Sequence, residues 1–317
     1  AAMARLATPE MVRAGYDKGL ATGVVASAGT LAALIPPSIL FVLYGIFAEV
    51  SIVELLIAGV FPGLLTAGIY AAMIMIRCVI NPDLAPKISD DELAEMKKER
   101  WTALKDVWPL LVLILGIIGG LYGGVVTPTE GGAAGASLAL VIGILQKRMN
   151  LELFIESLRD AIGTTAQIFF VGMGAVMYTK FLALAGVSTM MVEMIGAWAG
   201  DPILLVIAAS IIYVILGMFL DPLGIMLITI PVLVPMFVAL DLNLVWFGVI
   251  VVKYVEIGLL TPPVGFNVYV VKNVVGDSIA LHDIFKGCFW FLGCEVIIMT
   301  LLIAFPEISL WLPATMK

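Results

Sequence analysis

One acidic residue stands out in the apolar part of the chain. Asp221, in the segment FLDPLG, is the only residue charged at pH 7 between Ile203 and Leu240. A carboxylate in such an apolar stretch is costly and indicates a functional site, typically an ion site. Pro222 and Gly224 follow at once, so the chain is expected to turn at Asp221. Two interpretations are open: an ion-binding tip of a re-entrant hairpin, or a surface turn between two complete crossings.

Two proline pairs, Pro36–Pro37 and Pro262–Pro263, interrupt apolar runs. Each ring fixes φ and removes an N–H donor, so neither pair fits a regular helix. Within a membrane, the freed carbonyl groups are tolerated only where protein or a water-filled cavity covers them. Freed carbonyl oxygens and helix ends suit a small cation or a carboxylate. The pairs predict two unwound helices that line an ion and substrate site, and the alternative is a pair of packing kinks.

Other chemistry-bearing residues are few. Lys253 and Glu256 are three residues apart, so on a helix they share one face and either pair with each other or contact a substrate. The single histidine, His282, lies in a polar connection and offers little support for a proton relay. None of the patterns GxxxxGK[ST], HExxH or GxSxG occurs, so no enzymatic activity is expected.

The composition restricts the class of protein. Of 317 residues, 62% are hydrophobic and 13% are charged, about half the roughly 25% of a soluble domain. The mean hydropathy is +1.12, and the net charge of −7 leaves no basic surface for nucleic acid. The three cysteines form no CxxC pair, so neither a disulfide framework nor a zinc site is expected. These values exclude a soluble enzyme and indicate a polytopic membrane protein.

Runs of about 20 apolar residues are long enough to cross a hydrocarbon core roughly 30 Å thick. No segment shows the alternation of a barrel strand, so all spans are predicted to be helices. The expected spans are 24–48, 52–76, 107–126, 131–146, 162–186, 203–220, 222–240, 244–275 and 285–305.

Basic residues gather in two loops, 77–106 and the short run after 146. Residues 107–146 fit two crossings joined near Thr127–Glu130, so both loops lie on the same side, which the positive-inside rule makes cytoplasmic. Within the first loop, SDDELAEMKKERW (89–101) is amphipathic and predicts an interfacial helix. Glu130 itself is read as part of an ordinary connection.

The chain contains an internal repeat. Pro9 and the pair at 36–37 are 27 residues apart, and so are Pro235 and the pair at 262–263, at a constant offset of 226. Two homologous halves in one membrane chain are typical of secondary transporters, whose binding sites lie at the repeat interface near the midplane. If the two halves begin on opposite sides of the membrane, the repeats are inverted.

The repeat also predicts the domain organisation. At the same offset, the counterpart of Asp221 would fall before Ala1, and residues 1–22 hold no signal-peptide core. We therefore expect an N-terminally truncated subunit, with the remainder of the first repeat in 1–80, a cytoplasmic amphipathic connector in 81–106 and the second repeat in 107–317.

Five stretches that run through nearly the whole chain resemble the large, DctM-like M subunit of the tripartite ATP-independent periplasmic (TRAP) transporters. They are GTLAALIPPSILFVLYG (29–45), SIVELLIAGVFPGLL (51–65), GGVVTPTEGGAAGA (123–136), FLDPLGIMLITIPVLVP (219–235) and WFGVIVVKYVEIGLLTPPVGFNVYV (246–270).

The resemblance implies an all-α, inverted-repeat carrier of the elevator type with re-entrant hairpins and unwound helices, in the bacterial inner membrane. It implies import of a small organic anion, such as a C4-dicarboxylate or a sugar acid, driven by a sodium gradient. Sodium would be the coupling ion, with no other cofactor. The implied partners are a periplasmic solute-binding protein (P type) and a small four-helix membrane subunit (Q type).

The resemblance also implies site residues. Sodium ligands would be Asp221, at the tip of the second hairpin, together with Thr261, Gly258 and Gly29. The substrate would meet the two breaks at Pro36, Pro37, Ser38, Pro262, Pro263, Gly265 and Asn267. The tip of the family's first hairpin would precede Ala1.

Two alternatives stay open. A stand-alone ion-coupled anion carrier would need no binding protein. A non-transporting membrane scaffold would explain the apolar bulk but not two duplicated helix breaks. The identity of the anion, and whether Asp221 takes Na⁺ or H⁺, are also open, because burial could favour the protonated carboxyl.

Overall fold

The described part of the chain is all-α. The computed structural model describes residues 2–86, 108–187, 189–190, 193 and 202–315, which form helices joined by short connections with no strand among them. This confirms the predicted all-α polytopic architecture. Most of the predicted amphipathic connector lies outside the described residues, apart from 81–86 with the short helix η1 (Pro82–Leu84).

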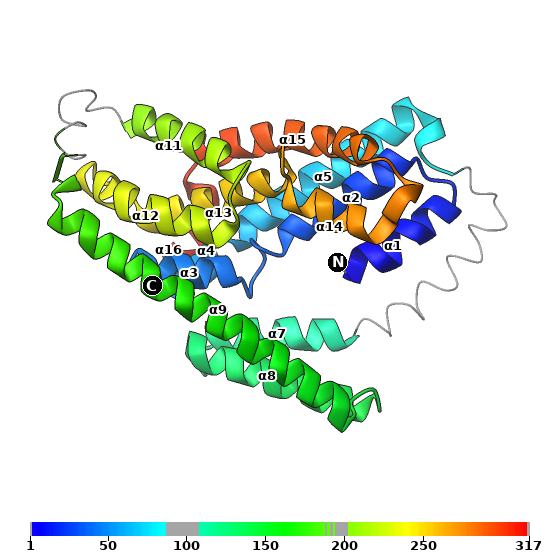
Figure 1. The fold of residues 1–317 in the computed structure, drawn as a ribbon, viewed down its shortest axis with the longest axis horizontal. Helices are drawn as coiled ribbons and strands as arrows, with labels where there is room; N and C mark the ends of the chain where they lie inside the picture. Colours follow the sequence, from blue (N-terminus) through cyan, green and yellow to red (C-terminus); the bar gives the residue numbers. More distant parts are fainter. Residues whose placement is uncertain (1, 87–107, 188, 191–192, 194–201, 316–317) are drawn as a thin grey trace. The chain divides into compact units, whose positions relative to one another are not determined.

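The chain divides into two compact units, 1–87 with 186–317 (unit 1) and 88–185 (unit 2). Unit 1 holds both proline pairs and Asp221 (Figure 1). Its helices are α1 (Ala2–Arg13), α2 (Lys18–Leu31), α3 (Ile39–Phe47), α4 (Ile52–Ala58), α5 (Val60–Ile80), η1, α11 (Pro202–Gly217), α12 (Pro222–Ala239), α13 (Leu244–Leu260), α14 (Phe266–Val275), η2 (Gly276–Ser278), α15 (Leu281–Ala304) and α16 (Glu307–Ala314).

Unit 2 contains α7 (Trp108–Tyr122), α8 (Pro128–Leu145) and α9 (Leu151–Leu184). α7 packs against α8, as expected for two crossings joined by a short loop. At the start of α8 the Thr127 hydroxyl accepts from the Glu130 N–H, and the Glu130 carboxylate accepts from the Thr127 N–H at 2.8 Å. This reciprocal capping box satisfies two free donors of the helix start, so Glu130 belongs to an ordinary connection.

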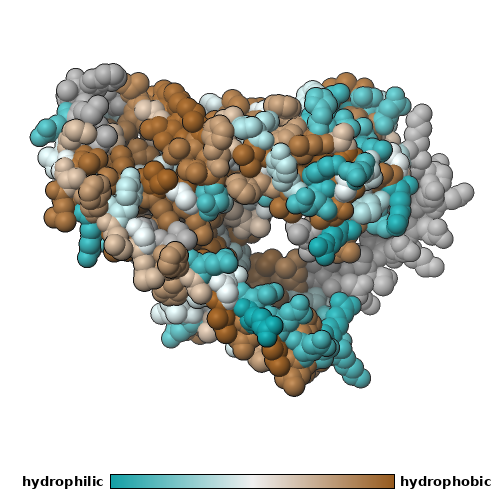
Figure 2. Space-filling view, viewed as in Figure 1, coloured by the Kyte–Doolittle hydropathy of each residue, from teal (hydrophilic) through white to brown (hydrophobic). Residues whose placement is uncertain are grey.

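The predicted spans correspond to helices, but 24–48 and 244–275 are each divided at a proline pair, and α9 begins at Leu151 rather than at 162. Five described helical segments are long and apolar enough to cross a membrane: 52–80, 128–145, 151–184, 222–239 and 281–304. Figure 2 shows hydrophobic side chains across much of the visible face of unit 1, with hydrophilic ones near α1 and the end of α5. Two described α-helices lie outside the predicted spans: α1, at the start of the chain, and α16, a short helix that follows Pro306.

The repeat is visible in the helix boundaries. At the offset of 226, Lys18 and Leu244 correspond, and these residues begin α2 and α13. Arg13 and Ala239 likewise correspond, and they end α1 and α12, each of which contains the equivalent proline. Even one cap is repeated, since the Leu20 N–H donates to Asp17 and the equivalent Trp246 N–H donates to Asn243. The helices α1, α2 and α3 are therefore the counterparts of α12, α13 and α14.

The two repeats interlock. α1 of the first repeat packs against α14 of the second, and the counterpart pair, α12 and α3, also pack together. α2 packs against its own counterpart, α13. Such an exchange of equivalent contacts is what a two-fold relation between the halves produces. The helix that follows each break consequently packs against a helix of the other repeat.

Candidate functional site

Both proline pairs lie at breaks between helices, as predicted. The first break separates α2 from α3, and the second separates α13 from α14. Both Pro–Pro peptide bonds are cis. In Figure 1 the two breaks lie near the middle of unit 1, and so does the turn between α11 and α12 that carries Asp221. α11 and α12 therefore form a hairpin that occupies one half of the unit.

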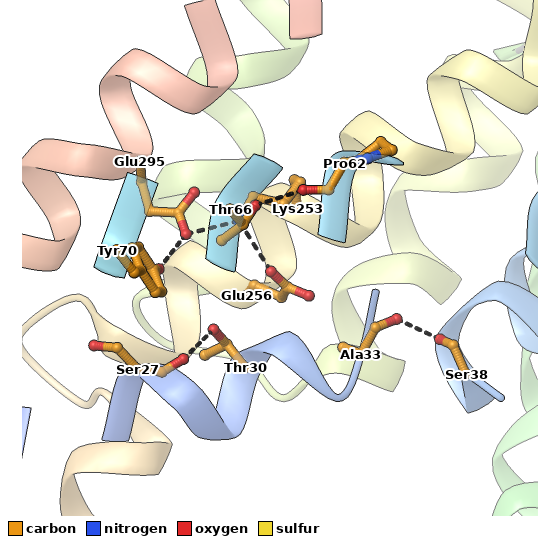
Figure 3. Close-up of polar contacts among 10 residues, drawn as sticks. All are labelled: Ser27, Thr30, Ala33, Ser38, Pro62, Thr66, Tyr70, Lys253, Glu256 and Glu295. Carbon is orange, nitrogen blue, oxygen red and sulfur yellow. Dashed lines mark hydrogen bonds and ion pairs between the residues drawn. The ribbon is translucent and has the colours of Figure 1, made fainter. Parts of the chain in front are cut away.

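At the first break, Ser38 is buried and its hydroxyl is used locally. The hydroxyl donates to the Ala33 carbonyl and accepts from the Phe41 N–H at 3.3 Å, so it caps α3 (Figure 3). Pro36 is buried and Pro37 is exposed. Ser38 therefore links the end of the unwound segment to the start of α3, which orients the carbonyl groups of the break.

At the second break, Gly265 has a φ of 58°, in the left-handed region, and it precedes α14. A Cβ atom at this position would lie 2.9 Å from the Phe285 ring, so both the conformation and the space require glycine. Pro262 is half-buried and Pro263 is exposed, a pattern that resembles the first break. The Thr261 hydroxyl donates to the Ile257 carbonyl at 2.6 Å, and the lone pairs of its oxygen can still accept.

Asn267 joins the two repeats. Its Nδ2 donates to the main-chain oxygen of Ala26 on α2, at 3.2 Å. The same Nδ2 would lie 3.5 Å from a Cβ atom at Gly29, one turn further along α2. Two predicted site residues that are 238 positions apart in the sequence are thus neighbours in space.

Asp221 begins α12 as its N-cap. Its Oδ2 accepts from the N–H groups of Leu223 and Gly224, at 3.1 and 3.3 Å, and the residue is exposed. Because the capping bonds involve Oδ2, Oδ1 keeps its lone pairs for a further partner. The residue is therefore at the turn of a hairpin, exposed rather than enclosed by the described part of the chain.

A close glycine contact joins this hairpin to the second break. Gly258 on α13 lies against Gly217 at the end of α11, so near that a Cβ atom on Gly258 would be 2.5 Å from the Gly217 Cα. Asp221 follows Gly217 by four residues, and Thr261 follows Gly258 by three. The contact therefore holds the end of α11 against the end of α13, close in sequence to Asp221 and Thr261.

A buried charge cluster lies among α13, α15 and α5. Lys253 on α13 forms ion pairs with Glu256, at 3.1 Å, and with Glu295 on α15, at 2.7 Å. Tyr70 on α5 donates its hydroxyl hydrogen bond to the same Glu295 oxygen. The side chains of Lys253 and Glu256 have no exposed area, which confirms their pairing and argues against direct substrate contact.

The cluster lies where the repeats meet. At the offset of 226, Lys253 and Glu256 correspond to Ser27 and Thr30 on α2, and Figure 3 shows these two residues facing the cluster. Oε1 of Glu256, Oε2 of Glu295 and the hydroxyl of Ser27 are buried and make no hydrogen bond among the described residues. The ammonium and the two carboxylates link α13 to α15, and the Tyr70 hydroxyl adds α5 to the cluster.

Glu295 and Tyr70 were not among the predicted site residues. Glu295 is the only acidic residue in the predicted span 285–305, so the reasoning that identified Asp221 could have identified it too. Tyr70 has no comparable signal, because its partner is 225 residues away.

Comparison with known proteins agrees with the geometry. Residues 1–308 match the family described as the tripartite ATP-independent periplasmic transporter, DctM component. The chain is 33% identical to a putative TRAP transporter large permease protein of Haemophilus influenzae, over 97% of this chain and 75% of the relative. It is 31% identical to the sialic acid TRAP transporter large permease protein SiaM of Vibrio cholerae, over 98% and 71%. It is 32% identical to the C4-dicarboxylate TRAP transporter large permease protein DctM of Pseudomonas aeruginosa, over 99% and 72%.

Proposed function

The chain belongs to the DctM component family of the TRAP transporters, and from this premise we propose that it is the permease subunit of a sodium-coupled importer of small organic anions. The observation that carries the proposal is the hydrogen bond from Asn267, on the helix that follows the second break, to Ala26, on the helix that precedes the first break. Helix breaks at the repeat interface are where secondary transporters bind substrate and coupling ions.

The sodium ligands are proposed to be oxygen atoms around the second break and its hairpin. Asp221 supplies the negative charge, through a carboxylate oxygen that its capping bonds leave available. Thr261 supplies a hydroxyl and Gly258 a main-chain carbonyl, close to the Gly217 contact. These are hard oxygen donors, which suit a small cation. Gly29, on the other repeat, is the corresponding candidate near the first break.

The anion is proposed to lie between the two breaks. The amide of Asn267, which bonds to the other repeat, and the segments at Pro36–Ser38 and Pro262–Gly265 are the proposed contacts of the anion. A carboxylate is the expected recognised group, because helix starts at a break present N–H groups and a partial positive charge. The substrates in the names of the SiaM and DctM relatives, sialic acid and C4-dicarboxylate, belong to this chemical class.

All of the predicted site residues belong to unit 1. We propose an elevator mechanism in which this unit carries the bound anion and sodium across the bacterial inner membrane. The solute is delivered by a periplasmic binding protein, and a small membrane subunit completes the permease. Because the site residues lie in one compact unit, the binding geometry can persist while that unit moves.

The test is uptake into proteoliposomes that contain the full-length subunit and its small partner. The cognate binding protein is added with radiolabelled solute, with an inward gradient of either sodium or choline. We expect uptake only when both sodium and the binding protein are present. Uptake without the binding protein would indicate a stand-alone carrier, and no uptake by a correctly folded complex would indicate a scaffold.

A further inference from the structure

A polar pocket lies at the hydrophilic end of unit 1. It has a volume of about 460 Å³ and is enclosed by the start of α2, the end of α5, η1 and the start of α15. Its charged lining residues are Asp17, Lys18, Arg77, Asp283 and Lys286. Asp17 is engaged as the N-cap of α2 and Lys18 reaches the Ser278 carbonyl at 3.4 Å. Arg77 and Lys286 form no ion pair among the described residues.

Arg77 is held in place but incompletely satisfied. Its guanidinium lies over the Trp290 ring, with Cζ 4.4 Å from the ring centroid. Its Nη1 is nevertheless buried and has no hydrogen-bond partner in the described part of the chain. A buried donor without a partner is costly, whereas a guanidinium held by an aromatic ring is well suited to bind an oxyanion.

An apolar groove opens directly beside this pocket. It has a volume of about 600 Å³ and runs between α5 and α15, lined by Ile69, Ala72, Met73, Ile76, Cys294 and Ile297. Arg77, Asn81, Leu84 and Trp290 line both the groove and the polar pocket. Ile76 and Ile297 are more than half exposed, so the groove is on the outer surface of unit 1.

We propose that this pair of cavities binds one anionic phospholipid. The phosphate group binds Arg77 and Lys286 in the polar pocket, and one acyl chain lies in the groove between α5 and α15. Charge complementarity favours an anionic lipid, because three cationic and two acidic side chains line the pocket. A soluble anion would occupy the polar pocket but leave the adjoining apolar groove uncovered. The predicted cytoplasmic loop follows Asn81, so the lipid belongs to the cytoplasmic leaflet, where anionic headgroups attract basic residues.

Two variants test the headgroup contact and the acyl-chain contact separately. Arg77→Gln removes the cation, and Arg148→Gln, at an exposed site in unit 2, is the matched control. Ala72→Trp fills the groove without changing charge, and Ala71→Trp, on the exposed neighbouring position of α5, is its control.

The experiment is native mass spectrometry of the permease complex titrated with phosphatidylglycerol, phosphatidylcholine or inorganic phosphate. We expect tight binding of phosphatidylglycerol, weakened by about fivefold in Arg77→Gln, as for the loss of one basic contact. Ala72→Trp should also weaken it, while both controls bind normally. Unchanged phosphatidylglycerol binding in either test variant would overturn the proposal. The proposal would also be overturned if inorganic phosphate competed with the lipid and bound equally well to Ala72→Trp. That result would indicate a site for a free anion.

Discussion

The side-chain amide of Asn267 donates a hydrogen bond of 3.2 Å to the main-chain carbonyl of Ala26. Asn267 is the second residue of α14, just after the second break, and Ala26 is on α2, the helix that precedes the first break. The bond is a direct polar link between the two halves of the repeat. It also places a side-chain amide beside Gly29.

Replacing Asn267 tests the importance of this link. Asn267→Ala should lower solute uptake by about fivefold, because a typical hydrogen bond contributes about 1 kcal/mol. The matched control is Asn273→Ala, at an exposed position on the same helix. Equal uptake by the two variants would contradict a role for Asn267 in joining the breaks.

Asp221 can be tested without disturbing its cap. Asparagine is as good an N-cap as aspartate, so Asp221→Asn should keep α12 intact while removing the charge. We expect normal membrane insertion and melting temperature, but uptake that requires a much higher sodium concentration. Asp221→Ala should additionally lower stability by about 1 kcal/mol, through the lost cap. Unchanged sodium dependence in Asp221→Asn would remove this residue from the ion site.

The contact between Gly217 and Gly258 should not tolerate a methyl group. A Cβ atom at Gly258 would be 2.5 Å from Gly217 Cα, and overpacking of this kind costs about 1–3 kcal/mol. Gly258→Ala should therefore lower the melting temperature and weaken sodium binding by displacing the Asp221 turn.

The control for this substitution is Gly172→Ala on α9, where a Cβ atom has no neighbour within 4 Å. Alanine is the better helix former, so this variant should be neutral or slightly more stable. If both variants behaved alike, steric contact would not explain the glycine at 258.

Much of this arrangement could be predicted from the sequence, and the reason is physical. Helix spans follow from apolar length, and the breaks follow from paired prolines, because both are local properties of the chain. The contact between Asn267 and Ala26 could not be predicted, since nothing local specifies which helices meet. The exposure of Asp221 also depends on the packing of its hairpin, which a count of apolar neighbours does not reveal.

The buried cluster should be held together by charge balance. Lys253→Met leaves two carboxylates without their cation, and removing one partner of a buried ion pair costs about 3–5 kcal/mol. We expect a large fall in melting temperature, measured in detergent. Lys180→Met, at an exposed position of α9, should have little effect on stability.

A triple variant tests the cause. Combining Lys253→Met with Glu256→Gln and Glu295→Gln removes the uncompensated charges and should restore part of the lost stability. A triple variant no more stable than Lys253→Met alone would show that packing around the lysine, rather than charge, stabilises this region.

The most direct test of the central claim is the melting temperature of the purified permease complex in sodium chloride and in choline chloride at equal ionic strength. A ligand that binds only the folded state raises its stability, so sodium should raise the melting temperature of the natural protein. The same comparison should show a much smaller sodium effect in Asp221→Asn and a normal effect in Asn273→Ala. Equal melting temperatures of the natural protein in the two salts, or full protection by sodium in Asp221→Asn, would contradict a sodium site at this hairpin.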